Sequence, residues 1–236
     1  MKYALALLAL VAAVLSEDIH FETVVGGRSG NGKTTRYWDC CKPSCAWKEN
    51  IRTRDMKPVN TCAKNGRNTL SPSVQSGCNG GSAYMCNNNQ PWAVNNTLGY
   101  GFAAASFAGG VDTNMCCACF KVDFTDQIAG KSMVIQVTNT GSDLSSNHFD
   151  IALPGGGVGI FNAGCHNQWN APWNGWGDQY GGVKSRNECY TLPKDLQSGC
   201  LFRFDFLKNA NNPGMRFNQV KCPREIIAKS GCSLDP

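Results

Sequence analysis

The sequence contains 236 residues, of which 22 are Lys or Arg and 17 are Asp or Glu, so its formal net charge at pH 7 is +5. This charge is modest and no dense run of Lys or Arg occurs, so nucleic acid is not an expected partner. The histidines, His20, His148 and His166, are not at metal-ligand spacing, and the paired CxxC pattern of a zinc site does not occur. We therefore expect no metal site.

Residues 1–16, MKYALALLALVAAVLS, have the layout of a secretory signal peptide: a basic start, a short apolar stretch and small residues at its end. This stretch is shorter than the ~20 apolar residues that cross a bilayer, and no later stretch is longer, so no membrane partner is expected. All 14 cysteines follow it, and their even number favours disulfides and an extracellular location. We expect a secreted protein with a lead segment over 17–26 and one domain over 27–236. No Pro/Ser/Thr-rich tether to a second binding module occurs.

Short runs of β-branched and aromatic residues, bounded by Gly, Asn and Pro, recur along this domain and are typical of strands. Residues 60–92 are rich in Asn, Gly and Ser and indicate long loops that disulfides hold in shape. The segment GGGVGIFNAG (155–164) lacks the GK[ST] ending of a phosphate loop, so we expect a tight turn there. The pattern alone predicts an all-β barrel or sandwich, with strands over residues 36–40, 101–107, 116–124, 131–140, 147–154, 200–207 and 216–222.

Two aspartates stand out because each falls inside a predicted strand. In SNHFDIALP, the alternation of side chains sends the apolar residues into the core and places Asp150 and His148 on the opposite face. In RYWDC, the same alternation places Asp39 on one face with Tyr37, while the adjacent cysteines can anchor the strand. A desolvated carboxyl group has a raised pKa, which suits a proton donor near neutral pH.

Two carboxylates in different environments are the groups that glycoside hydrolysis requires. One gives a proton to the leaving oxygen, and the other activates water or attacks the sugar. Structural interpretations remain open, because a single Asp or His in a strand is more often a hydrogen-bonded structural residue, and a tryptophan is more often part of a core. The aromatic residues that could pack on sugar rings are Tyr37, Trp47, Trp92, Trp169, Trp173 and Trp176.

At TTRYWDCCKPSCAW (34–47) the chain resembles glycoside hydrolase family 45, the small inverting endoglucanases. The similarity covers the chain from about Gly27 onward. It implies a six-stranded double-psi β-barrel with long disulfide-stapled loops, an open substrate groove and a single catalytic domain over 27–236. The segments that carry it further are PWAVNN, LGYGFAA, MCCACF, GSDLSSNHFDIALPGGGVGIFNAGC, YGGVKSRNECY and FRFDFLKNANNPGMRFNQVKCP.

The resemblance also implies roles for particular residues. Asp39 matches the general base that activates water, and Asp150 matches the general acid that protonates the glycosidic oxygen. Asp143 matches an aspartate on a mobile loop beside the cleft, which helps to tune or close the site. The implied substrate is a β-1,4-glucan, cleaved with inversion and without a cofactor. The residues that match positions lining the site or contacting sugar are Thr35, Tyr37, Trp47 and His148.

The family's cysteine pattern is complete in this chain. The pairs that it implies are Cys40–Cys165, Cys41–Cys78, Cys45–Cys116, Cys62–Cys86, Cys117–Cys232, Cys119–Cys222 and Cys189–Cys200.

Several alternatives remain open at this point. Xyloglucan or a mixed-linkage glucan could be the substrate on the same scaffold, and the Trp-rich loop 166–180, which differs from better-known members, bears on that choice. A non-hydrolytic expansin-like protein shares the barrel but lacks the base, so Asp39 favours hydrolysis; a barwin-type lectin is shorter than this chain. We expect a monomer, and Asn95 begins an N-glycosylation sequon, Asn95-Asn96-Thr97.

Overall fold

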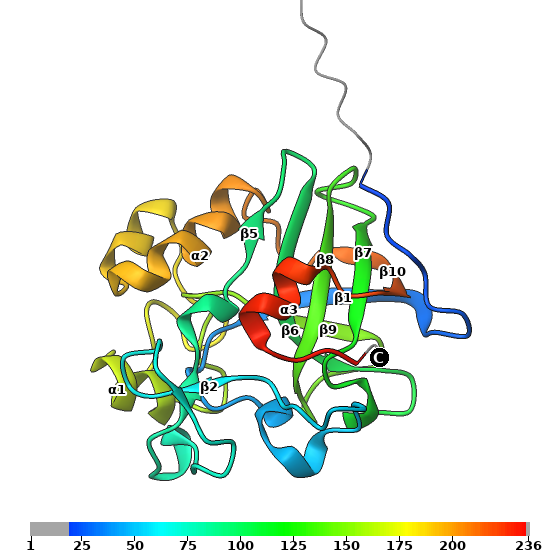
Figure 1. Ribbon diagram of the computed structural model, residues 1–236. Helices are drawn as coiled ribbons and strands as arrows, with labels where there is room; N and C mark the ends of the chain where they lie inside the picture. The colour runs from blue at the N-terminus through cyan, green and yellow to red at the C-terminus, as the bar shows by residue number, and fades with distance from the viewer. Residues whose placement is uncertain (1–18, 235–236) are drawn as a thin grey trace, which may run out of the picture.

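The computed structural model describes residues 19–234, and β-strands dominate this range (Figure 1). The expected signal peptide, 1–16, lies outside the described residues. The strands are β1 Ser29–Tyr37, β2 Thr61–Cys62, β3 Thr69–Leu70, β4 Tyr84–Met85, β5 Trp92–Ala93, β6 Leu98–Ser106, β7 Cys119–Phe124, β8 Ser132–Thr140, β9 His148–Ala152 and β10 Gly214–Val220. The α-helices are α1 Ala163–Trp169, α2 Lys194–Asp205 and α3 Arg224–Ser230. The 3₁₀ helices are η1 Ser44–Ala46, η2 Lys48–Asn50, η3 Gly77–Asn79, η4 Asn87–Asn89, η5 Thr113–Met115 and η6 Arg186–Thr191.

The main sheet closes on itself into a barrel. Its strand order is β5-β6-β8-β7-β10-β1-β9, and β9 also pairs with β6, so six strands form the closed barrel while β5 extends from β6. The β1–β9 and β6–β8 pairs are parallel, and the other neighbours in the barrel are antiparallel. Closure leaves the barrel strands without a free edge. The predicted all-β class with a closed six-stranded barrel is confirmed.

Aromatic side chains fill the barrel at the centre of its larger apolar core. Phe107, Phe120, Phe149 and Phe217 are each at most 1% exposed, and their ring centroids lie 5.3–6.3 Å apart. Edge-to-face contacts at such distances add to the free energy gained by burying the rings. Since Phe149 faces this core, its neighbours in β9 face the other way, as the alternation predicts.

The predicted strands 101–107, 116–124, 131–140, 147–154 and 216–222 coincide largely with β6 to β10. The strand predicted over 200–207 is wrong, because most of it belongs to helix α2. Pro193 directly precedes that helix, and its buried residues include Leu196, Cys200 and Arg203, which lie at helical spacing. The alternating phenylalanines of this segment imitate a strand pattern, which is why the sequence misled.

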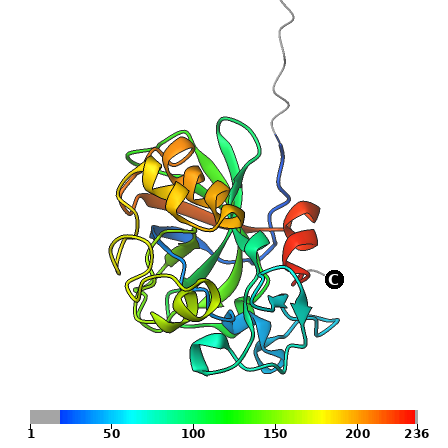
Figure 2. The same ribbon diagram turned by 90° about the vertical axis from the view of Figure 1, so that its left-hand side faces the viewer.

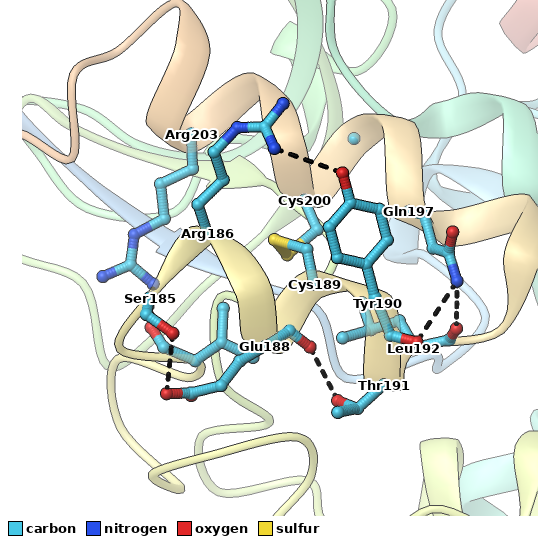
Figure 3. The surroundings of a disulfide bond; sticks show 12 residues. Ser185, Arg186, Glu188, Cys189, Tyr190, Thr191, Leu192, Gln197, Cys200 and Arg203 are labelled. Atoms are coloured by element: carbon cyan, nitrogen blue, oxygen red, sulfur yellow. Dashed lines mark hydrogen bonds between the residues drawn. A yellow bond between two sulfur atoms is a disulfide. The ribbon is translucent and has the colours of Figure 1, made fainter.

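Seven disulfides fasten the loops to the barrel. They join the same pairs that the resemblance implies. Figure 3 shows one of them, Cys189–Cys200, which ties η6 to α2. The disulfides therefore connect the barrel and its loops covalently at several places.

None of the helices between residues 19 and 234 combines the length and the apolar character that a membrane crossing requires.

Candidate active site

Asp39 lies just beyond the end of β1, in a segment that two disulfides hold. Cys40 is bonded to Cys165 in α1, and Cys41 is bonded to Cys78 in η3. Asp39 is 5% exposed, and its Oδ1 accepts a hydrogen bond of 2.9 Å from the backbone N–H of Cys41. The prediction that Asp39 lies inside a strand is wrong. The strand ends two residues earlier, and the chain turns at Cys40, whose φ of 64° leaves the extended conformation.

Helix α1 packs directly on the Asp39 segment, and a glycine makes this approach possible. A Cβ atom at Gly164 would lie 2.3 Å from the carbonyl oxygen of Asp39 and 2.5 Å from Cys78 Sγ. Neither neighbour can move easily, because one is backbone and the other is part of a disulfide. Gly164 and the adjacent Cys165 therefore fix the helix against Asp39.

Asp150 lies on β9, which runs parallel to β1 with Thr35 in register opposite it. The Thr35 hydroxyl donates a hydrogen bond of 2.5 Å to Asp150 Oδ1, and His148 Nε2 lies 2.7 Å from the same hydroxyl oxygen. The backbone N–H of Ser145 donates to His148 Nδ1 at 3.4 Å. Since Nδ1 accepts, the proton of a neutral imidazole is on Nε2. Donation therefore runs from Ser145 through His148 and Thr35 to Asp150.

His148 is suited to remain neutral in this chain of hydrogen bonds. It is 6% exposed, and burial lowers its pKa to about 4, with a further lowering by the charge of Lys33. At neutral pH the imidazole therefore acts as a donor to Thr35 and does not bring a positive charge beside Asp150.

Burial raises the pKa of both carboxyl groups. It raises that of Asp39 to about 7, although the hydrogen bond from Cys41 opposes the change, and the charge of Asp150 adds to it. It raises the pKa of Asp150 to about 6 against the opposing effect of the Thr35 hydroxyl. Because the two groups interact, their protons belong to the pair. The pair therefore holds about one proton between pH values of about 6 and about 7.

Tyr37 and Asp143 both lie within electrostatic reach of the two carboxylates. Burial is the main cause that raises the pKa of the Tyr37 hydroxyl, and Asp39 and Asp150 raise it further. The Tyr37 hydroxyl oxygen also accepts a hydrogen bond of 3.1 Å from Asn139 Nδ2. Asp143 is exposed, and its charge raises the pKa of Asp39 and of Asp150. The structure thus brings Thr35, Tyr37 and His148 together with the predicted pair.

The tryptophans occupy separate places. Trp47 is half-buried and lies under the Lys42 ammonium, which is 3.1 Å from the ring centroid. Trp173 is 55% exposed and stacks on His166 at 4.1 Å. The other tryptophans that could pack on sugar rings lie elsewhere. Trp169 and Trp176 line a cavity of about 510 Å³ beside α1, and Trp92 packs against Tyr100 and Phe102 in the β5–β6 region.

Sequence reasoning missed two residues that act on Asp150. Ser145 fixes the tautomer of His148, and Arg36 lowers the pKa of Asp150 through its charge. Alternation places Arg36 on the opposite face of β1 from Thr35, where its Nε donates to the Gly181 carbonyl at 3.2 Å. The influence of Arg36 depends on distance in three dimensions, and no spacing in the sequence signals it. Within residues 19–234, no group of three or more His, Cys, Asp or Glu side chains is arranged to hold a metal ion.

The geometry defines a class of protein before any comparison. Two carboxyl groups with raised pKa values, both close to one tyrosine and each held by a separate hydrogen-bond donor, form the kind of site that a glycoside hydrolase uses.

Comparison with known proteins gives the family. Residues 31–233 match the family model described as glycosyl hydrolase family 45. An endoglucanase of Phaedon cochleariae is 59% identical over 211 residues, which cover 89% of this chain and 87% of that protein. An endoglucanase of Cryptopygus antarcticus is 55% identical over 212 residues, covering 89% of this chain and 92% of that protein. The crystal structure of the cellulase from that Antarctic springtail superposes with a TM-score of 0.84, covering 89% of this chain and 99% of its own. The chain therefore belongs to glycosyl hydrolase family 45.

Proposed function

We propose that this chain is a secreted endo-β-1,4-glucanase that cleaves internal bonds of cellulose-type glucans with inversion of configuration. Asp39 acts as the general base and Asp150 as the general acid. The observation that carries this proposal is the hydrogen bond from Thr35 to Asp150 Oδ1, which leaves Oδ2 free to hold the proton that the leaving oxygen needs. The naming of related proteins as endoglucanases supports the substrate class.

The reactive form of the pair has its proton on Asp150 and a charge on Asp39. It is the less populated of the two singly protonated forms, because the pKa of Asp39, about 7, is above that of Asp150, about 6. Asp39 keeps its Oδ1 on the Cys41 N–H, so its other oxygen can accept a proton from the attacking water. Inversion requires carboxyl groups ~6.5–9.5 Å apart, wider than in a retaining enzyme, so that water fits between them. Asp39 lies four residues beyond Thr35, the partner of Asp150 in register. Asp39 is therefore not directly opposite Asp150 in the ladder, and this offset along the chain supports the wider arrangement.

The mechanism assigns supporting roles to the surrounding residues. Neutral His148 holds the Thr35 hydroxyl so that its proton points to Asp150, and exposed Asp143 keeps the pKa values of both carboxyls high. Tyr37 and Trp47 are proposed to contact the sugar rings. The seven disulfides support an extracellular location, and Asn95, the proposed glycan site, is exposed.

The test is the release of reducing sugar from amorphous cellulose, xyloglucan and mixed-linkage glucan by the wild type, Asp39→Asn and Asp150→Asn. We expect the wild type to cleave at least one polymer and each variant to lose at least about 100-fold in kcat. The anomer first released, followed by NMR, should be α. A folded wild type that is inert on all three polymers, or an active Asp39→Asn, would favour a non-hydrolytic, expansin-like role instead. A β-anomer would rule out inversion.

A further inference from the structure

A cavity of about 970 Å³ lies away from the candidate active site. It is bordered by β5, by α2, by η4 and by the end of α3. In the ribbon of Figure 2, α2 is orange and α3 is red. None of the residues assigned to the reaction lines it. We name it the α2 groove, and its chemistry differs from that of the carboxylate pair.

Both carboxylates that line the α2 groove are already neutralised. Asp195 accepts two hydrogen bonds from Arg67, at 2.9 and 2.6 Å. Asp205 accepts two from Arg186, at 2.7 and 2.9 Å. Bidentate pairs of this kind are the more persistent of surface ion pairs. Each carboxylate therefore has an arginine as its direct partner, and Lys208 acts on Asp205 only through its charge, without a salt bridge.

Three lysines of the α2 groove form no ion pair with an Asp or Glu of residues 19–234: Lys131, Lys208 and Lys229. Lys131 and Lys208 are close enough for the charge of Lys208 to lower the pKa of Lys131, after the larger effect of burial. Because Arg67 is paired with Asp195, the groove presents the positive charge of these three lysines to a ligand. Such a surface attracts an anion.

The aromatic rings of the α2 groove are already covered. The Lys229 ammonium lies 4.6 Å from the Trp92 ring centroid, and Lys131 lies 4.3 Å from that of Phe206. Phe206 also stacks on Phe202 at 4.7 Å. A neutral sugar that stacks on an open ring face would have to displace these ammonium groups. A ligand with carboxylates would instead bind these ammonium groups without displacing them.

The remaining polar groups of the groove suit hydroxyls. Asn87 is 7% exposed, its Nδ2 donates to Asn65 O and Asp195 Oδ2, and its buried Oδ1 has no partner. Other side-chain amides line the same cavity, and they can donate and accept: Asn60, Asn88 and Asn96.

We propose that the α2 groove is a second, non-catalytic binding site for an acidic polysaccharide, a chain of uronic acids whose carboxylates bind Lys131, Lys208 and Lys229. Its hydroxyls bind the amides of the groove. In a wall made of mixed polysaccharides, this contact would hold the enzyme beside its substrate without occupying the active site. The site does not depend on which neutral glucan the carboxylate pair cleaves.

The experiment measures binding of a decamer of galacturonic acid by isothermal titration calorimetry. Three proteins are compared: the wild type, Lys131→Gln/Lys208→Gln/Lys229→Gln, and the control Lys57→Gln/Lys64→Gln/Lys184→Gln, which changes the net charge equally with exposed lysines outside the groove. We expect the Kd of the groove variant to be at least tenfold higher than that of the wild type, and the Kd of the control to change little. The fully methyl-esterified decamer, which has the same backbone without charge, should bind the wild type at least tenfold more weakly.

Activity on neutral amorphous cellulose tests whether a variant is folded, independently of whether it binds the decamer. The groove variant should retain the wild-type rate, since none of its lysines touches the carboxylate pair. The loss of the ring contacts of Lys131 and Lys229 can lower its melting temperature without changing that rate. Equal loss of decamer binding in both triple variants would show attraction by the net charge alone and overturn the proposal. The proposal would also be overturned if the wild type bound the methyl ester as tightly as the charged decamer. The same holds if cellohexaose bound the wild type and lost that binding in the groove variant. These results are independent of whether Asp39 and Asp150 prove to be catalytic.

Discussion

At the scale of single residues, one hydroxyl connects the two strands of the site. Thr35 donates a hydrogen bond to Asp150 and accepts one from His148, so it decides which oxygen of Asp150 is free. This role is distinct from that of Thr34, whose hydroxyl donates to the Pro213 carbonyl on the other side of the strand. The neighbouring threonines therefore provide a matched pair for experiment.

Thr35→Val should lower kcat about 10- to 100-fold, because Oδ1 loses the donor that orients the carboxyl. The hydroxyl lowers the pKa of Asp150, so its removal should move the alkaline limb of the kcat/KM profile to higher pH. Thr35→Ser should restore both properties, and Thr34→Val should leave the profile unchanged. A Thr35→Val profile with wild-type limbs would mean that the hydroxyl only supports packing.

Asp143→Asn should shift both limbs of the pH profile to lower pH. The charge of Asp143 raises the pKa of Asp39 and Asp150, so its removal lowers both. Because the side chain is exposed, the shift should be a fraction of a unit and should shrink as salt is added. Profiles recorded at low and high ionic strength check this; a shift to higher pH, or none at low salt, contradicts it.

At the scale of elements, the site depends on how α1 meets the turn after β1. The contact is close because position 164 has no side chain, and the Cys40–Cys165 bond fixes the two partners together. The helix is only seven residues long, so packing and the disulfide, more than intrinsic helix propensity, hold it in place.

Gly164→Ala should reduce the free energy of unfolding by about 1–3 kcal/mol, the usual cost of overpacking. It should also reduce kcat, because the added methyl displaces the carbonyl of Asp39. Gly30→Ala is the control, since the atoms nearest to its Cβ would be in side chains and not in the backbone of other segments, the closest being Asn147 Nδ2 at 3.3 Å. Chemical denaturation and kinetics of both variants test this, and similar behaviour of the two would show that α1 adjusts freely.

The same scale shows what the sequence could predict and what it could not. Alternation identified the strand of Asp150 because β9 is a regular strand, paired with β1 on one edge and with β6 on the other. It failed at residues 200–207, where alternating phenylalanines lie on a helix. It also failed at Asp39, which lies between the end of β1 at Tyr37 and the turn at Cys40, whose φ is positive. The hydrogen bond from Thr35 to Asp150 was not predictable, because these positions come together only through the pairing of β1 with β9. The hydrogen bond from Ser145 to His148 is local, but it depends on the turn before β9, where Asn147 has a φ of 50°.

At the scale of the whole molecule, the buried carboxyls make stability depend on pH. A carboxyl whose pKa is higher in the folded state than in the unfolded chain binds protons more tightly when folded. The stability that it contributes is greatest below the unfolded value and falls as pH rises through the folded value. For Asp39 this window extends from the ordinary value of 3.8 to about 7.

Asp39→Asn should therefore be more stable than the wild type at pH 8 and similar to it at pH 4. The shift of about three units sets an upper limit of ~4 kcal/mol on the difference. The amide oxygen can still accept the Cys41 N–H, so the turn is preserved. Denaturation at both pH values measures the effect, and a variant less stable than the wild type at pH 8 would contradict it.

The parallel pairing of β1 with β9 sets the spacing between the acid and the turn that holds the base. The positions of the acid and of the turn that holds the base follow from one ladder of backbone hydrogen bonds, in which Thr35 is opposite Asp150. Outside the barrel, this spacing depends on α1 and on the two disulfides that hold the turn of Asp39. The part of the Trp-rich loop beyond α1, residues 170–180, could therefore be exchanged between relatives to alter which polymer is held, while the interval between the two carboxyls stays constant.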